Sequence, residues 1–515
     1  MIRSFVTVST GTLASRLLGF LRDSMIASLI GTGAVADAFL LAFQFVNLVR
    51  RLLSEGALNA ALVPTWLRLR ETRGAMAAAA FAGRLLGTLS IALLAATLLM
   101  GPLMPLIITA LAPGFAGHES LLLAVIDARL MLPYLAFAGP STVLLALASA
   151  QGRFALAAFS PLLFNIALIS VMIVLRHRRA EADFVALALA ATVAIAGFLQ
   201  LSILVLRRSG EATAGRLRVS FDAEMRGFFG RAIPGMVAST APQLLMLAGT
   251  IIASASPSAV SWLYFANRLV ELPLGIVGVA MGTVLIPELT RAAHGGNSEA
   301  IGDAQLRAVE LAVGLALPAM LGLIGLSTPI VRLLFEHGAF TSVDTDATSH
   351  ALTFLALGLP AQVLVKAISP AFFAREDTLA PLLATLKAFV VAIASAVLLG
   401  HFFGPNGIAA ALSLGAWSHA LALLSRGSAS FGLSLDAAAR RRLPRIAAAA
   451  LAMGGLVWLA ATFVLPLTAG SARAVCLFTL IAGAIAVYAL LLAALGVTGW
   501  RQAVAALKQS RNEHA

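Results

Sequence analysis

The sequence has few of the residues that build disulfides, metal centres or the surface of a soluble enzyme. Among 515 residues there is one cysteine, Cys476, so neither a disulfide nor a Cys-based metal site can form within one chain. The eight histidines follow no HExxH or Cys/His spacing, and no Walker motif is present. Only 11% of residues are charged, well below the share in soluble domains. We therefore expect no metal site, no cofactor and no enzymatic activity.

Long apolar runs dominate what remains, since 60% of residues are hydrophobic. Runs of about 20 residues recur along the whole chain, long enough to cross about 30 Å of hydrocarbon as helices. The sequence predicts an all-α polytopic membrane protein with about 14 transmembrane helices. The predicted spans lie near residues 5–32, 35–65, 80–110, 122–150, 156–176, 184–206, 232–254, 258–288, 308–335, 347–373, 380–403, 406–425, 446–467 and 473–497. The first run contains charges and lacks a small-residue cleavage site, so we expect it to stay as a helix.

The basic residues are spread over alternate loops. A net charge of +13 would suit nucleic acid, but no single basic domain collects it, and we expect no nucleic-acid partner. Positively charged loops stay on the cytoplasmic side of a membrane. This distribution predicts that both termini are cytoplasmic.

An internal repeat divides the chain. LAFAGP at 135–140 and LALGLP at 355–360 are each followed by a second proline, Pro161 and Pro381, and both offsets are 220 residues. A repeat of six spans keeps its two copies in the same orientation, related by a pseudo-two-fold axis along the membrane normal. We predict an N-lobe at 1–215, a C-lobe at 216–430 and a C-terminal segment at 431–515 that carries a helical pair. Two such lobes are typical of a transporter with a central cavity.

Charged residues inside the apolar runs are the candidate site, beginning with SRLLGFLRD at 15–23. Each charge costs at least about 2.5–3.5 kcal/mol at a helix centre, so it must face water or a partner. The set comprises Arg16, Arg22, Arg50, Arg51, Arg268, Asp23, Asp37, Glu55 and Glu271.

Two interpretations of these charges stay open. Mutual pairing is one, because Arg16 and Asp23 are seven residues apart and Arg51 and Glu55 are four apart, each pair on one helix face. The other is an anion site, because the cations outnumber the acids once Asp37, near the outer surface, is set aside.

Arginine's planar fork suits phosphate oxygens. We therefore predict a substrate site with a set of supporting polar residues. The predicted substrate-binding residues are Arg16, Arg22, Arg50 and Arg268. The predicted supporting residues are Asp23, Asp37, Asn47, Arg51, Glu55 and Glu271. Asn47 and Gln243 could instead bond between helices, and Lys366 and Lys387 are expected to extend toward the cytoplasmic surface.

The same stretches resemble a known family. SRLLGFLRD at 15–23, IGTGAVADAFLLAF at 30–43, NLVRRLLSEGALNAALVP at 47–64 and WLYFANRLVELPLGIVGVAMGTVLIPEL at 262–289 are similar to signature segments of the MurJ (MviN) lipid II flippases. That family belongs to the multidrug/oligosaccharidyl-lipid/polysaccharide exporter superfamily. The resemblance implies a bacterial inner-membrane protein that moves lipid II, the undecaprenyl-pyrophosphate-linked peptidoglycan precursor, from the cytoplasmic to the periplasmic leaflet by alternating access.

The resemblance also implies further roles and partners. The cavity arginines of the family correspond to Arg16, Arg22, Arg50 and Arg268, and the extra helical pair would hold the lipid tail. Partners would be lipid II and membrane lipids, with the cell-wall synthesis machinery as a further candidate, and the protein would act as a monomer. Sodium coupling is not expected, because 232–254 and 379–400 contain no carboxylate.

Two alternatives remain. A multidrug or polysaccharide exporter of the same superfamily is one, although a cation exporter would require carboxylates in its cavity. A membrane glycosyltransferase using a polyprenyl-phosphate donor is the other, but its catalytic carboxylate would need a sizeable external loop, and the predicted external loops are short.

Overall fold

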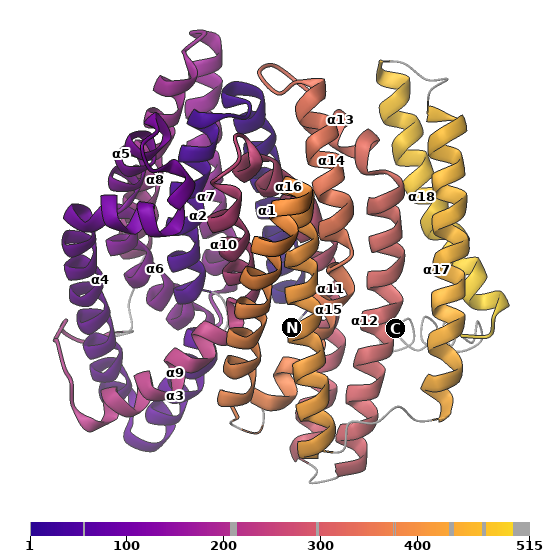
Figure 1. The fold of residues 1–515 in the computed structure, drawn as a ribbon. Coiled ribbons are helices and arrows are strands. Elements are labelled where there is room, and N and C mark those ends of the chain that lie inside the picture. The colour runs from indigo at the N-terminus through magenta and orange to yellow at the C-terminus, as the bar shows by residue number, and fades with distance from the viewer. Residues whose placement is uncertain are drawn as a thin grey trace.

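The computed structural model describes residues 2–54, 57–206, 214–294, 298–373, 375, 377–431, 437–465 and 470–497, and these residues contain helices but no strand (Figure 1). Apolar runs become helices because helical backbone satisfies its own hydrogen bonds where no water can do so. The first half comprises α1 (Ile2–Ile30), α2 (Ala34–Ser54), α3 (Ala57–Arg73), α4 (Ala75–Leu111), η1 (Pro113–Phe115), α5 (Glu119–Met131), α6 (Pro133–Ala150), α7 (Phe154–His177) and α8 (Ala182–Leu206). The second comprises α9 (Ala223–Ser239), α10 (Ala241–Ala253), α11 (Ala259–His294), α12 (Ser298–Gly325), α13 (Ser327–Phe335), α14 (Ser342–Ala356), α15 (Leu359–Phe373) and α16 (Leu379–Phe431), followed by α17 (Ala437–Phe463) and α18 (Ser471–Ala494).

The all-helical membrane fold is confirmed, while the count of fourteen spans stays a prediction. Eight described helices are long and apolar enough to cross a membrane, or ten if the bent pairs α9–α10 (57°) and α14–α15 (43°) each form one span. Helices α1, α2 and α11, which carry the candidate charges, are not among these ten. The predicted division near residue 404 corresponds to a kink in α16 at Gly404, whose φ of 57° is not helical.

The predicted span 35–65 falls on two described helices, α2 up to Ser54 and α3 from Ala57. It stays a prediction as a single helix, because residues 55 and 56 lie outside the described part. The last turns of α3 contain Arg68, Arg70 and Arg73. Because charged side chains favour the polar membrane surface, we expect this basic end of α3 to lie at that surface and not at the membrane centre.

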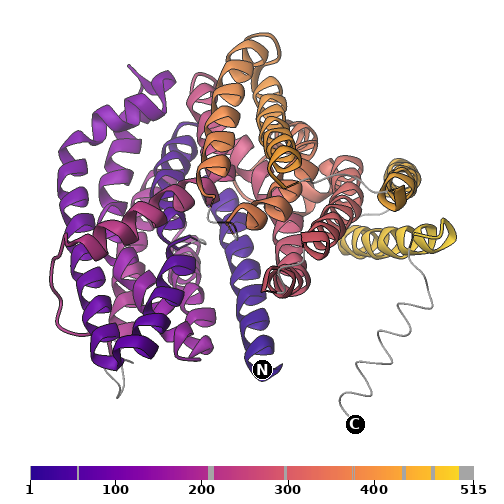
Figure 2. The same ribbon diagram turned by 90° about the horizontal axis from the view of Figure 1, so that it is seen from below.

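The two halves repeat the same helix pairings. In the first half α1 packs on α7, α2 on α5 and α4 on α6; in the second, α10 packs on α16, α11 on α14 and α12 on α15. These are the pairs that a repeat of about 220 residues would superimpose. Seen from below, α1 lies between the two groups of helices (Figure 2). The boundaries near residues 215 and 430 remain predictions.

The segment between the halves is attached to α4. Residues 207–213 lie outside the described part, but 214–222 follow the surface of α4, where a Cβ on Gly83 would collide with the segment's backbone. The Thr88 hydroxyl donates to the carbonyl oxygen of Ser220 (3.2 Å). Asp222 then caps α9 by accepting from the backbone N–H of Met225 (2.8 Å), and this bond lowers the pKa of the Asp222 carboxyl. The segment is therefore anchored to the first half before α9 begins.

The C-terminal pair packs on the outer side of the second half (Figure 1). Helix α17 lies against α12 and α18, and Tyr488 of α18 donates to the carbonyl oxygen of Gly314 in α12 (2.7 Å). Many outward side chains of the pair are large and apolar, as expected for a surface that faces lipid.

Candidate functional site

Asp23 lies at the centre of the charged cluster and is fully buried. Its Oδ1 is 2.6 Å from Nη2 of Arg22, and its Oδ2 is 2.5 Å from Nε of Arg268 on α11. The Tyr264 hydroxyl, one turn earlier on α11, donates to Oδ1 (3.3 Å). The sequence predicted Arg16 as a partner of Asp23, and the ion pairs that the structure shows for Asp23 are those with Arg22 and Arg268. A single carboxylate therefore joins the first half of the protein to the second.

Arg22 is enclosed within the first half and only 7% exposed. Its Nη1 donates to Oδ1 of Asn165 on α7 (3.0 Å), and its guanidinium lies 5.0 Å from the ring centre of Phe43 and 6.0 Å from that of Phe164. A carboxylate, an amide and two aromatic faces are the partners that a buried guanidinium requires. The prediction that Arg22 contacts substrate stays untested, but this burial favours a role in holding Asp23.

A second bridge between the halves runs through Glu271 of α11. Its Oε1 is 3.2 Å from Nη1 of Arg51 on α2, and its Oε2 accepts from Nη1 of Arg268 (2.8 Å). The side-chain amide of Gln243 on α10 also lies against the Arg51 guanidinium. The side chains of Arg268, Arg51 and Glu271 keep 18%, 15% and 26% of their surface exposed, so they lie at the edge of accessible space. The predicted partner of Arg51, Glu55, lies outside the described residues.

Arg50 and Asn47 interact within α2. Asn47 Oδ1 accepts from Nε (2.9 Å) and Nη2 (2.8 Å) of Arg50, one turn further along the helix. The partner seen for Asn47 is therefore on its own helix, and its amide orients the Arg50 guanidinium.

Arg16 is exposed and lies against α11. A Cβ added to Gly275 would overlap its guanidinium. The converse contact is made by Arg268, whose Nη2 would lie 2.7 Å from a Cβ on Gly19 of α1. Helix α11 thus carries Gly275 where Arg16 of α1 lies, and α1 carries Gly19 where Arg268 of α11 lies. A side chain at either glycine would overlap the guanidinium of that arginine.

Asp37 does not belong to this cluster. It is 2% exposed and accepts from the backbone N–H of Ser261 (2.9 Å) and from the Ser261 hydroxyl. Along α2 it is 14 residues from Arg51, about 21 Å. It connects α2 to α11 near the start of both helices, where Asp344 of α14 likewise accepts from Thr32 (2.5 Å).

Several contributing residues were not among the predicted site residues. Asn165 and Tyr264 bond to Arg22 and Asp23, and Gly19 and Gly275 give room to the arginines. Asn165 carries a usable signal, since it is a lone amide within the apolar run 156–176. The two glycines carry none, because glycine is common in membrane helices.

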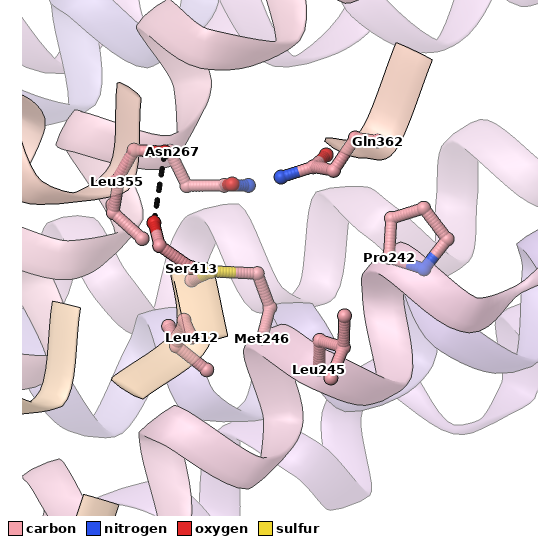
Figure 3. Close-up of a pocket in the computed structure, with 8 residues that line it drawn as sticks. All are labelled: Pro242, Leu245, Met246, Asn267, Leu355, Gln362, Leu412 and Ser413. Atoms are coloured by element: carbon pink, nitrogen blue, oxygen red, sulfur yellow. Dashed lines mark hydrogen bonds between the residues drawn. The ribbon is translucent and has the colours of Figure 1, made fainter. Parts of the chain in front are cut away.

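A small pocket lined by both apolar and polar side chains lies inside the second half (Figure 3). The amide groups of Asn267 on α11 and Gln362 on α15 point toward one another across it, and Ser413 of α16 donates to the carbonyl oxygen of Leu355 (3.3 Å). The space suits about one water molecule. Among the described residues, no group of three or more histidine, cysteine or acidic side chains is placed to hold a metal ion.

Comparison with known proteins decides the family. The family model described as "Lipid II flippase MurJ" matches residues 26–478. The "Probable lipid II flippase MurJ" of Rhizobium meliloti (strain 1021) is 37% identical over 495 residues, which cover 95% of this chain and 92% of the relative. The chain belongs to the MurJ lipid II flippase family. The family resemblance predicted from the sequence is therefore confirmed.

Solved structures agree on the fold. A structure titled "Lipid II flippase MurJ, inward closed conformation" matches with a TM-score of 0.79 at 23% identity, covering 97% of this chain and all of the other. A multidrug resistance MATE family transporter of the MOP superfamily, in an inward-facing conformation, matches with a TM-score of 0.66 at 16% identity, covering 86% of this chain and 98% of the other. At these identities the likeness shows the fold alone. The all-helical fold predicted from the sequence is thereby confirmed, while the roles of single residues remain predictions.

Proposed function

We propose that this protein moves lipid II from the cytoplasmic to the periplasmic leaflet of a bacterial inner membrane by alternating access, for peptidoglycan synthesis. Membership of the MurJ family supports the substrate class. The observation that carries the mechanism is the pair of ion bridges between the halves, Arg268 to Asp23 and Arg51 to Glu271.

The bridges explain how an anionic substrate would release the closed arrangement. Phosphate oxygens bind guanidinium groups as carboxylates do, often in a bidentate geometry. A pyrophosphate that reaches Arg268 therefore competes with Asp23 and Glu271 for the same N–H groups. Loss of these carboxylate contacts loosens the junction of α1 and α2 with α11, which allows the two halves to turn relative to one another.

The charge balance favours an anion. By sequence, the candidate set holds five arginines and three carboxylates, so its formal charge is +2; these residues are Arg16, Arg22, Arg50, Arg51 and Arg268, and Asp23, Glu55 and Glu271. In the proposed roles Arg16, Arg50 and Arg268 bind the pyrophosphate, while Arg22 holds Asp23 in place. We also propose a cavity between the two halves at this site. The partial exposure of Arg268, Arg51 and Glu271 supports it.

The proposal includes an orientation. With both termini cytoplasmic, α1 starts at the cytoplasmic side and α11 starts at the periplasmic side. The contacts of Asp37 with Ser261 and of Asp344 with Thr32 then close the periplasmic end. Helices α17 and α18 are proposed to hold the lipid tail, and the protein is proposed to act as a monomer.

Rescue of a strain depleted of its own lipid II flippase tests the function, with the leaflet location of lipid II as the readout. The chain should restore transport to the outer leaflet, and Arg268→Ala should abolish it without loss of expression. Arg268→Lys should restore it only in part, because an ammonium cannot form the bidentate contact. Arg442→Ala is the control, since this exposed arginine pairs with Glu310 away from the site. Normal transport by Arg268→Ala would contradict the assignment, and failure of the unmodified chain would contradict the function.

A further inference from the structure

The side of α11 that contacts the first half extends past Arg268 toward the end of the helix. Arg268, Glu271, Gly275 and Gly278 follow spacings of three and four residues, so they lie on one side of the helix. The contacts of Arg268, Glu271 and Gly275 with residues of α1 and α2 show that this side faces the first half. Gly278 therefore lies on the same interhalf face, one turn further along.

Lys366 of α15 reaches this face. Its Nζ would lie 3.8 Å from a Cβ on Gly278, and the residue is exposed. Neighbours at i and i+3 on a helix have Cβ atoms about 5–6 Å apart, so the Lys366 ammonium is no more than about 11 Å from the Arg16 guanidinium at Gly275. Lys366 was expected only to extend toward the cytoplasmic surface. Its ammonium also lies close to the side of α11 that faces the first half, next to Gly278.

The cations form two groups that differ in depth and in burial. Arg22 and Arg268 lie around the buried Asp23. Arg16 and Lys366 are exposed, and Gly278 is ten residues, about 15 Å, further along α11 than Arg268. In the proposed orientation this second group lies nearer the cytoplasm. A phosphate arriving from that side would meet it before reaching Arg268.

We propose that Lys366 and Arg16 form an entry position for the pyrophosphate group, from which the substrate passes to Arg268. This inference rests on the proposed function. The entry position holds the headgroup by charge while the ion bridges between the halves are still closed. Lys366 acts in capture of the substrate, whereas Arg268 acts in the release of those bridges.

Transport in proteoliposomes at increasing mole fractions of lipid II separates these two actions. Lys366→Gln should raise the half-saturating mole fraction about tenfold, as expected for the loss of one charged contact, and leave the maximal rate within about twofold. Lys366→Arg should keep the half-saturating value near that of the unmodified protein, because the charge remains. Lys387→Gln is the matched control, since Lys387 is an exposed lysine on α16.

Two glycine variants test the Arg16 side of the same position. Gly275→Ala should raise the half-saturating mole fraction, because the new methyl group displaces the Arg16 guanidinium. Gly278→Ala should not, since its methyl group would make only an ordinary contact with Lys366.

An unchanged half-saturating value in Lys366→Gln, whatever its maximal rate, would overturn the entry position while leaving the proposed function intact. Absence of transport by the unmodified protein would instead reject the proposed function itself. This comparison requires a Lys366→Gln protein that is monodisperse and normally folded. Where that protein cannot be obtained, the Lys366→Arg variant is measured in its place. A half-saturating value raised tenfold in Lys366→Arg, despite the retained charge, would also overturn the inference.

Discussion

Replacing Asp23 by asparagine would remove one negative charge from the buried cluster at nearly constant volume. Arg268 would keep its contact with Glu271. Arg22, at 7% exposure, would lose its counter-ion and keep uncharged partners, namely the new amide oxygen, Asn165 and the two aromatic rings. The energetic consequence therefore falls mainly on Arg22.

The size of this effect follows from the burial. Removing one partner of a buried ion pair costs about 3–5 kcal/mol, because the other charge is left without compensation. The remaining amide and ring contacts of Arg22 place the expected loss near the lower end, about 3 kcal/mol. For a chain of this length a loss of about 1 kcal/mol lowers the thermal midpoint by about 1 °C, so we expect a fall of about 3 °C.

Heating in detergent followed by size-exclusion chromatography of the remaining monodisperse protein measures this midpoint. Asp346→Asn is the matched control, because Asp346 is an exposed carboxylate on α14. Adding Arg22→Gln to Asp23→Asn should recover at least half of the loss, since the uncompensated charge disappears with the arginine. A midpoint for Asp23→Asn within about 1 °C of the unmodified protein, or a double variant less stable than the single one, would refute the reasoning.

Two further predictions concern the ends of the transport cycle. Asp37→Ala removes the acceptor for Ser261 on α11, so a cysteine placed at Ser28 in a Cys476→Ala background should react faster with an external thiol reagent; an unchanged rate would show that this contact does not hold the outer end closed. A chain ending at residue 436 should keep both halves folded, because the described contacts of the C-terminal pair are with α12 and α13, but should lose lipid II transport in the depletion assay. Transport at the normal rate would exclude the pair from tail binding.

The sequence could predict the candidate residues better than their partners. Arg22, Asp23 and Arg268 were identified because charges are costly inside apolar runs. The pairing of Asp23 with Arg16 was proposed from helix spacing alone, and that spacing holds only within one helix. The structure places Arg268, from a helix of the other half, against Asp23, and no spacing rule could have predicted this contact.

The sequence by itself determined the helical membrane fold, the family and the set of buried charges. Each of these depends on local patterns, namely apolar runs of about 20 residues, signature segments and polar residues within them. Only the tertiary structure decided which charges meet, that Arg22 is enclosed while Arg16 is exposed, and that Lys366 lies beside the interhalf face of α11. Those outcomes depend on how α1, α2, α11 and α15 pack, and packing between helices distant in sequence leaves no periodic signal in either one.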